Sequence, residues 1–157
     1  MDIKLILNNI KFKYRVSAII INENNLLVSC YNDNKYCLPG GYVEIGETSI
    51  EAIKREIHEE LRLNIINPKY IGIIENFFAN FKGDRTHELD FYYLINISNN
   101  DAKNIDLNYI EHDKNGIIKH NFKWIKISEL NHFMLVPSLL IGIIQNKKFN
   151  FHYIIKE

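Results

Sequence analysis

Hydrophobic and polar positions alternate along several stretches of the chain, which indicates β-strands separated by short polar turns. The β-branched run at 14–21 predicts a central strand, and 26–31 predicts its partner across the polar turn at 23–25. Residues 69–81 and 87–97 predict a second antiparallel pair. In 87–97 apolar residues occupy the odd positions and mostly polar residues the even ones, so we expect the odd face to be the buried one.

A single long helix is predicted between these two strand pairs. Pro39-Gly40-Gly41 form a turn, and Thr48, followed three residues later by Glu51, matches a capping box. At about 100° per residue, one face of the following helix carries four apolar side chains. We expect these to face the core: Ile50, Ile53, Ile57 and Leu61. The helix is predicted to end near Leu61.

The other segments predict shorter elements. Residues 1–13 predict a strand or extended arm, and 98–116 predict a polar loop with a hairpin turn at Asn115-Gly116. A short strand is predicted at 122–125 and a short helix or turn from 128. A helix with Pro137 as its first residue continues over 138–145, and 149–155 predict a final strand or a packed tail. This order of elements in 157 residues predicts one domain of the α/β or α+β class.

Three carboxylates gather on the helix face next to its core face. Glu56, Glu59 and Glu60 lie at spacings of three and four residues, with Ala52 among them. Like charges at this spacing cost about 0.2–0.5 kcal/mol a pair, whereas hard divalent cations take oxygen ligands. The cluster therefore indicates a candidate Mg²⁺ site. An exposed acidic face without a role is the alternative that the triplet alone leaves open.

The glycine turn and this helix together resemble the signature of the Nudix hydrolases. That signature reads Gly, five residues, Glu, seven residues, then Arg-Glu-apolar-x-Glu-Glu-x-Gly-apolar. The matching residues are Gly41, Glu47, Arg55, Glu56, Ile57, Glu59, Glu60 and Leu63. One position departs, because Arg62 stands where the family has a glycine that ends the helix in a left-handed conformation. Arg62 must either take up that strained conformation or let the helix run on to Asn64.

The resemblance implies both a fold and a set of roles. The fold would be a Nudix-like α/β/α sandwich with a mixed central β-sheet, as one domain over 1–157. The implied Mg²⁺ ligands are Glu56, Glu59 and Glu60 together with the carbonyl of Gly40, and Mn²⁺ is a substitute ion. Arg55 and Glu47 would form an ion pair that holds the loop against the helix, and both are counted with the catalytic residues.

For the general base and for the substrate contacts the sequence offers several candidate residues. Glu56 is one candidate base, and the family also places the base in a late loop, where Glu111, His112 and Asp113 lie. Glu88 is a candidate to reach substrate or metal, with a sheet-edge residue as its alternative. Weaker candidates for substrate contact are Phe77, Phe78, Phe81, Arg15 and Arg85. The alternative for the aromatic residues is that they pack into the core, and the alternative for the arginines is that they face solvent.

The function that the resemblance implies is Mg²⁺-dependent hydrolysis of the diphosphate linkage in a nucleoside diphosphate derivative. A metal ion neutralises the anionic diphosphate and activates water. The alternative is a non-catalytic module on the same fold that binds a nucleotide or ADP-ribose. Such a module would tolerate the loss of metal ligands, yet all three glutamates are present.

The composition of the chain bears on its binding partners and on its cellular compartment. Nineteen basic and nineteen acidic residues give a formal net charge of zero, which argues against binding of polymeric nucleic acid. Cys30 and Cys37 are expected to be buried free thiols. With no run of 18 apolar residues and no signal peptide, we expect no membrane span and a cytoplasmic setting. Pairing into a homodimer is a further expectation that the family suggests.

Overall fold

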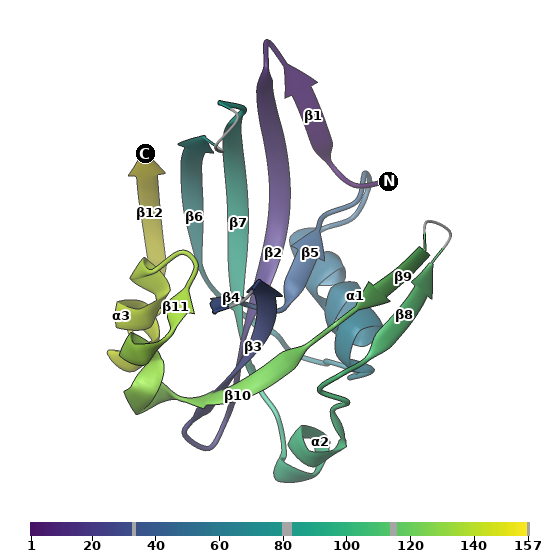
Figure 1. Cartoon of the computed structure of the whole chain (residues 1–157), viewed down its shortest axis with the longest axis vertical. Coiled ribbons are helices and arrows are strands. Elements are labelled where there is room, and N and C mark those ends of the chain that lie inside the picture. Colours follow the sequence, from purple (N-terminus) through teal and green to yellow (C-terminus); the bar gives the residue numbers. More distant parts are fainter. Residues whose placement is uncertain (33, 80–82, 114–115, 157) are drawn as a thin grey trace.

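The computed structural model describes residues 1–32, 34–79, 83–113 and 116–156 (Figure 1). In that part of the chain ten strands form one mixed sheet and two form a separate hairpin. The strands are β1 Lys4–Leu7, β2 Ile10–Asn22, β3 Asn25–Asn32, β4 Lys35–Cys37, β5 Gly40–Tyr42, β6 Lys69–Ala79, β7 Arg85–Asn96, β8 Ile110–Asp113, β9 Gly116–Lys119, β10 Phe122–Lys126, β11 Met134–Leu135 and β12 Phe151–Lys156. The helices are α1 Ser49–Leu61, α2 Asn99–Asn104, the 3-10 helix η1 Ile127–His132, and α3 Leu139–Gln145.

Strand β2 lies at the centre of the sheet, as its β-branched sequence predicts. It pairs with β7 in parallel and with β1, β3 and β5 antiparallel. The strand begins at Ile10, four residues earlier than predicted, and the N-terminal segment also contains β1. At the far edge β12 pairs in parallel with β6, so the sheet is mixed.

Helices cover both faces of this sheet, which confirms the predicted α/β architecture with a mixed sheet (Figure 1). On one face α1 packs Ile53 and Ile57 against Val16, Ala18 and Ile20 of β2. On the other face α3 and η1 pack against the intervening positions of the same strand. The main side chains there are Ile19, Leu130, Leu140, Ile143 and Ile144.

The expectation that only the odd positions of β7 are buried is wrong. Tyr93 and Ile95 are buried as predicted, in the cluster that α1 covers, but Asp90 and Tyr92 at even positions are also buried, with Tyr92 only 1% exposed. Period-two patterning distinguishes the faces only where one of them meets water. Because helices lie on both sides of β7, polar side chains on its even face are also buried.

Helix α1 begins as predicted, with a capping box. The Thr48 side chain accepts a hydrogen bond from the Glu51 backbone N–H, and the Glu51 side chain accepts one from the Thr48 backbone N–H. Its core face differs by one residue. Ile53, Ile57 and Leu61 are buried, but Ile50 is 42% exposed and Ala52 is buried instead. The Ser49 hydroxyl lies 2.7 Å from the Tyr93 hydroxyl, so Ser49 faces the sheet in the first turn and Ile50 is turned away.

The helix ends at Leu61, and Arg62 itself takes the left-handed conformation (φ 57°, ψ 24°). The alternative in which the helix runs on to Asn64 is therefore wrong. This conformation costs a non-glycine residue about 1–2 kcal/mol. The Arg62 guanidinium lies over the Tyr109 ring at 4.8 Å and donates to the Tyr109 hydroxyl, which offsets part of that cost.

Several local predictions need correction. The segment predicted as a polar loop contains α2, whose cap is Ser98, and the hairpin of β8 and β9. The predicted turn residue Asn115 lies outside the described residues. Pro137 follows a cis peptide bond and precedes the cap Ser138, so it is not the first residue of α3. Cys30 and Cys37 are free, as predicted, but only half-buried.

No helix in the described residues is long and apolar enough to cross a membrane.

Candidate active site

Two glycines of β5 bring the strand directly against the carboxylates of α1. A Cβ added to Gly41 would lie 2.2 Å from the Glu56 carboxyl carbon, so only glycine leaves room for this side chain. The Gly40 N–H donates to Glu60 Oε2 at 3.1 Å. The predicted turn at 39–41 is wrong for Gly40 and Gly41, because both pair with β2 as part of β5. Strand β5 and helix α1 therefore form one surface with Glu56 and Glu60 on it.

Arg55 connects the loop before the helix to the helix itself. Its Nε and Nη2 donate to the two carboxylate oxygens of Glu47 at 2.9 and 3.0 Å, and Nη2 also donates to the Tyr42 carbonyl. These bonds lower the pKa of Glu47 and raise that of Arg55. The ion pair that the resemblance implies is thus present, and its importance for the reaction stays a prediction.

Arg55 also engages two of the three predicted metal ligands. Its Nη1 donates to Glu56 Oε1 at 2.9 Å and to Glu59 Oε2 at 3.2 Å. Burial raises the pKa of Glu56 even though Arg55 opposes the shift, so a neighbouring cation would favour the ionised form. Among the described residues no three His, Cys, Asp or Glu side chains are gathered so as to hold a metal ion. The oxygen donors fit Mg²⁺ chemically, but Glu56 and Glu59 are directed to Arg55.

Glu60 has a histidine neighbour that the sequence did not indicate. His120 Nδ1 lies 3.9 Å from Glu60 Oε1, and its ring stacks between Tyr109 and Phe122 with centroids at 5.8 and 6.1 Å. Because Tyr109 also contacts Arg62, a series of contacts runs from the end of α1 back to Glu60. A lone histidine between two short strands carries no motif, so no sequence signal pointed to it.

A cavity of about 650 Å³ lies between the sheet and the segment 134–140. Its lining combines the cations Lys13, Arg15 and Lys35 with the rings of Tyr36 and Phe78. It adjoins the carboxylates, because β4 leads from the cavity wall at Cys37 through Pro39 into Gly40. The electrostatic interactions of Arg15 with Glu56 and of Cys37 with Glu60 reflect the same proximity.

Half-buried Arg15 and buried Asp90 are paired neighbours on β2 and β7, and both line this cavity. The Ser17 hydroxyl donates to both carboxylate oxygens of Asp90, at 3.0 and 2.7 Å. Burial raises the pKa of Asp90 to about 6, although Arg15 acts in the opposite direction. Arg15 Nε is buried and has no hydrogen-bond partner among the described residues. Arg15 is half-buried, whereas Arg85 is exposed.

Replacing Asp90 by asparagine is expected to flatten the dependence of stability on pH. Because the folded pKa of about 6 exceeds the ordinary 3.8, the folded state binds the proton more tightly. This stabilisation is fully present below about pH 4 and is lost as the pH rises through 6. Between pH 8 and pH 5 the wild type should gain about 1 kcal/mol more than Asp90→Asn in urea unfolding. Equal gains would contradict the prediction, and Asp2→Asn, at an exposed carboxylate, is the control.

The remaining predicted residues lie in different settings. Glu88 lines the cavity and pairs with Lys13 at 3.9 Å, and its strand β7 is an interior strand, so Glu88 is not a sheet-edge residue. The backbone of Glu111 belongs to β8, but its side chain lies outside the described residues, as does all of Phe81. Phe78 lines the cavity, whereas Phe77 stacks on His87 on the other face of the sheet.

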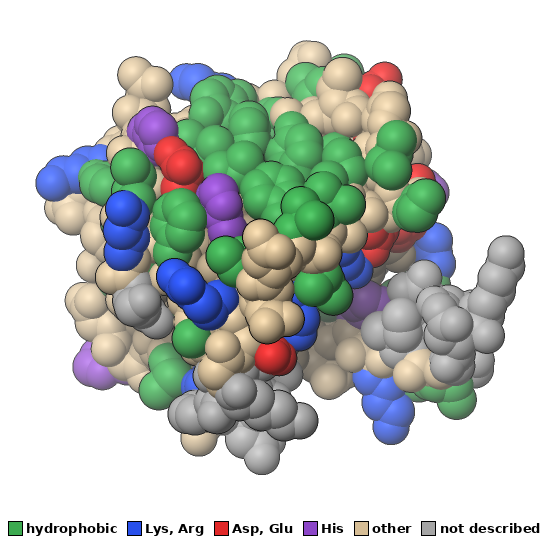
Figure 2. Space-filling model, turned by 90° about the horizontal axis from the view of Figure 1, so that it is seen from above, with side chains coloured by type: hydrophobic (Ala, Val, Ile, Leu, Met, Phe, Trp, Pro, Cys, Tyr) green, Lys and Arg blue, Asp and Glu red, His purple; other side chains and the backbone are tan. Residues whose placement is uncertain are grey.

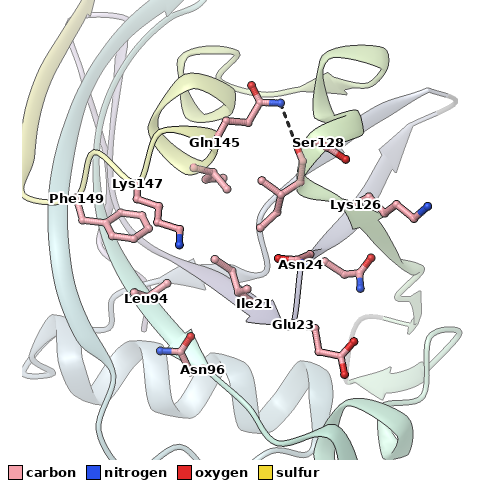
Figure 3. A pocket seen from close by; sticks show the side chains of 13 residues that line it. Ile21, Glu23, Asn24, Leu94, Asn96, Lys126, Ser128, Gln145, Lys147 and Phe149 are labelled. Atoms are coloured by element: carbon pink, nitrogen blue, oxygen red, sulfur yellow. Dashed lines mark hydrogen bonds between the residues drawn. The ribbon is translucent and has the colours of Figure 1, made fainter.

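A second cavity, of about 950 Å³, lies beside α3 near the β2–β3 turn (Figure 3). Ile21, Leu94 and Phe149 form its apolar wall, and Lys147 points into it (Figure 3). Gln145 Nε2 donates to the Ile127 carbonyl at its rim. None of the predicted site residues lines this cavity, so the smaller one beside the carboxylates is the candidate substrate cavity.

Comparisons with known proteins show the family of the chain. A family model described as NUDIX domain matches residues 11–140. The chain is 31% identical over 127 residues to an ADP-ribose pyrophosphatase from Methanocaldococcus jannaschii, covering 69% of this chain and 72% of that protein. It is also 31% identical over 77 residues to an 8-oxo-dGTP diphosphatase from Buchnera aphidicola, covering 46% of this chain and 59% of that protein.

Solved structures show the same fold at low sequence identity. A MutT protein from Bacillus halodurans has a TM-score of 0.61 at 19% identity, covering 85% of this chain and 80% of that one. A MutT protein from Methanosarcina mazei Go1 has a TM-score of 0.56 at 19% identity, covering 86% and 91%. At such identities the likeness concerns the fold alone.

Proposed function

The chain belongs to the NUDIX domain family, and from this premise we propose that it hydrolyses the diphosphate linkage of a nucleoside diphosphate derivative with Mg²⁺ as its cofactor. It is an enzyme of the nucleotide pyrophosphohydrolase type, as its named relatives are. The identity of the substrate and the use of the metal ion are the parts that we propose.

The observation that carries the proposal is the contact of both β5 glycines with the carboxylates of α1. Gly41 leaves space for the Glu56 carboxylate, and the Gly40 N–H holds Glu60. Glu56, Glu59, Glu60 and the carbonyl of Gly40 would hold the ion. A bound Mg²⁺ or Mn²⁺ would neutralise phosphate oxygens and lower the pKa of water. Glu47 holds Arg55 in place beside Glu56 and Glu59.

The adjoining cavity supplies groups suited to a nucleotide. Lys13, Arg15 and Lys35 provide positive charge, which favours phosphate. Tyr36 and Phe78 provide ring faces on which a base could stack. The buried Nε of Arg15 has no partner among the described residues, and a phosphate oxygen is the kind of acceptor that would satisfy it.

The names of the relatives suggest which substrates to test first. ADP-ribose is the leading candidate, because the ADP-ribose pyrophosphatase aligns with 69% of this chain, whereas the 8-oxo-dGTP diphosphatase aligns with 46%. Both compounds contain a nucleoside joined to a phosphoanhydride, which suits a cavity that offers aromatic rings and cations beside the acids Glu88 and Asp90, next to the carboxylate cluster.

A phosphate- and nucleotide-release screen tests the proposal directly. ADP-ribose, 8-oxo-dGTP, dinucleoside polyphosphates and nucleotide sugars would each be incubated with Mg²⁺, with Mn²⁺ and with a chelator. We expect turnover of at least one compound that disappears on chelation and returns with either ion. Turnover unchanged by the chelator would contradict the metal dependence. Tight binding of ADP-ribose without any release would favour the non-catalytic module.

A further inference from the structure

The larger of the two cavities described above has no part in the proposed reaction. It measures about 950 Å³ and is lined from the segments 21–25, 94–96, 126–128 and 144–149 (Figure 3). None of its lining residues also lines the candidate substrate cavity. Sites for small molecules typically measure about 300–1,000 Å³ and combine an apolar wall with a few converging polar groups. We refer to this space as the α3 cavity.

The apolar wall of the α3 cavity belongs to the hydrophobic core. Its members are Ile21, Leu94, Ile127, Ile144 and Phe149. Ile144 is buried in the core cluster, and the other four pack against that cluster. The wall is therefore already in place before anything binds. The ring of Phe149 lies beside Leu94 (Figure 3), so this wall suits a flat, apolar group.

One lysine supplies the charge inside the α3 cavity. Lys147 points into it (Figure 3), and in the described part of the chain its ammonium nitrogen has no carboxylate oxygen within 4.0 Å. The other two charged residues of the lining, Glu23 and Lys126, point away from the centre (Figure 3). Glu23 accepts a hydrogen bond from Asn99 at 3.1 Å, and Lys126 pairs with Glu129 at 3.6 Å. The interior of the cavity therefore favours an anionic group.

Lys147 occupies a backbone position that favours glycine. Its φ is 51°, in the left-handed region. The Lys148 N–H donates to the Ile143 carbonyl at 2.9 Å, and the Lys147 N–H donates to the Ile144 carbonyl at 3.3 Å. This pair of bonds is the Schellman motif, whose left-handed residue is usually glycine. Glu23, in the same lining, also has a left-handed φ of 53°. Strained residues of this kind cluster at ligand sites.

Amide side chains complete the lining. Asn24, Asn96 and Gln145 come from the β2–β3 turn, the end of β7 and the end of α3. The Gln145 amide donates to the Ile127 carbonyl at 2.9 Å, and the Ile127 N–H donates to the Asn24 carbonyl at 2.9 Å. These bonds attach three separate segments to one another. An amide can both donate and accept, so it suits ring nitrogens or hydroxyl groups of a ligand.

The other end of the sheet offers different chemistry. Figure 2 views that end from above and shows a broad area of hydrophobic side chains on an open face. Such an area provides few hydrogen-bond donors for an anion. The α3 cavity instead places an apolar wall, amides and a lysine around one space.

We propose that the α3 cavity is a second ligand site, which binds a small organic anion that carries a flat ring. The ring lies on the apolar wall beside Phe149, and the anionic group binds the Lys147 ammonium. A nucleoside monophosphate and an aromatic carboxylate share this chemistry, and the experiment below distinguishes them. The site does not depend on the proposed hydrolysis, because it shares no residue with the substrate cavity.

Two-dimensional amide NMR spectra of the isotope-labelled chain would locate the binding. The ligands are AMP and phenylacetate, and adenosine is the uncharged control. We expect at least one of the two anions to shift the amide signals of Asn24, Ile127 and Phe149 with a Kd below about 1 mM. Adenosine should bind there about tenfold more weakly or worse, because it lacks the anion. Shifts confined to the substrate cavity, no shifts from either anion, or equal binding of adenosine would overturn the proposal.

Substitutions at Lys147 separate its charge from its place in the fold. Lys147→Gly should weaken binding of the anion about tenfold or more, yet raise the Tm by about 2–4 °C, because glycine suits the left-handed backbone. Lys147→Arg keeps the charge and should keep the binding. The matched control is Lys148→Gln, which removes the charge of an exposed neighbour outside the lining and should change neither property. Unchanged binding in Lys147→Gly, or an equal loss in Lys148→Gln, would refute the site.

Discussion

Replacing Glu56 or Glu60 by glutamine is expected to reduce turnover by orders of magnitude while the melting temperature stays unchanged or rises. Both carboxylates lie against the two glycines of β5, where a neutral amide would fit but would not hold a divalent cation. Burial already disfavours the charge on Glu56, so removing that charge also removes its desolvation cost. Glutamine at 60 can still accept from the Gly40 N–H through its carbonyl oxygen.

Steady-state kinetics and thermal unfolding of the same preparations would separate catalysis from folding. The matched control is Glu129→Gln, which neutralises an exposed carboxylate in η1, remote in sequence from the helix and the two glycines. It should keep wild-type turnover. Full activity in both the Glu56 and Glu60 variants would exclude these side chains from the reaction and refute the proposed metal site.

Alanine at the two neighbouring glycines is expected to have opposite effects. A Cβ at Gly40 would lie 2.1 Å from the Val16 carbonyl oxygen and 2.9 Å from the Ser17 Cα, and its φ of +145° favours glycine. Since backbone atoms cannot move aside, Gly40→Ala should destabilise the fold by about 3 kcal/mol or more. The three atoms nearest a Cβ at Gly41 all belong to the Glu56 carboxyl group, at 2.2–2.3 Å.

The Glu56 side chain can rotate, so Gly41→Ala should unfold near the wild-type temperature but lose activity as Glu56→Gln does. Gly46→Ala is the control for backbone strain alone, because Gly46 has a φ of +87° and no atom within 4 Å of an added Cβ. It should cost about 1 kcal/mol. Urea unfolding and kinetics on all three variants would check this. An active Gly41→Ala or a fully stable Gly40→Ala would contradict the geometry.

Neighbouring residues in the chain account for what could be predicted. The capping box of Thr48 and Glu51 and the carboxylate spacing on α1 both involve residues within a few positions of one another. The central strand β2 was also predictable, because its β-branched run favours a buried strand. Even the two alternatives for Arg62 followed from its position, although its contact with Tyr109 did not.

The features that could not be predicted from the sequence depend on contacts between residues that are far apart in the chain. Ser17 binds Asp90 across 73 residues, and only the parallel pairing of β2 with β7 brings them together in a buried cavity floor. His120 reaches Glu60 because a separate hairpin is folded beside α1. The amphipathic pattern of β7 could not show that α3 would cover its polar side.

The helix, its N-terminal capping box and its set of carboxylates could therefore be predicted from the amino-acid sequence, because short-range hydrogen bonds and side-chain spacing along one helix specify them. Tertiary structure alone decided which polar groups are buried, which cavity adjoins the carboxylates and which sheet face stays open. Those properties depend on what packs on the other side of each strand, and burial changes the energy of a charge far more than its place in the chain does.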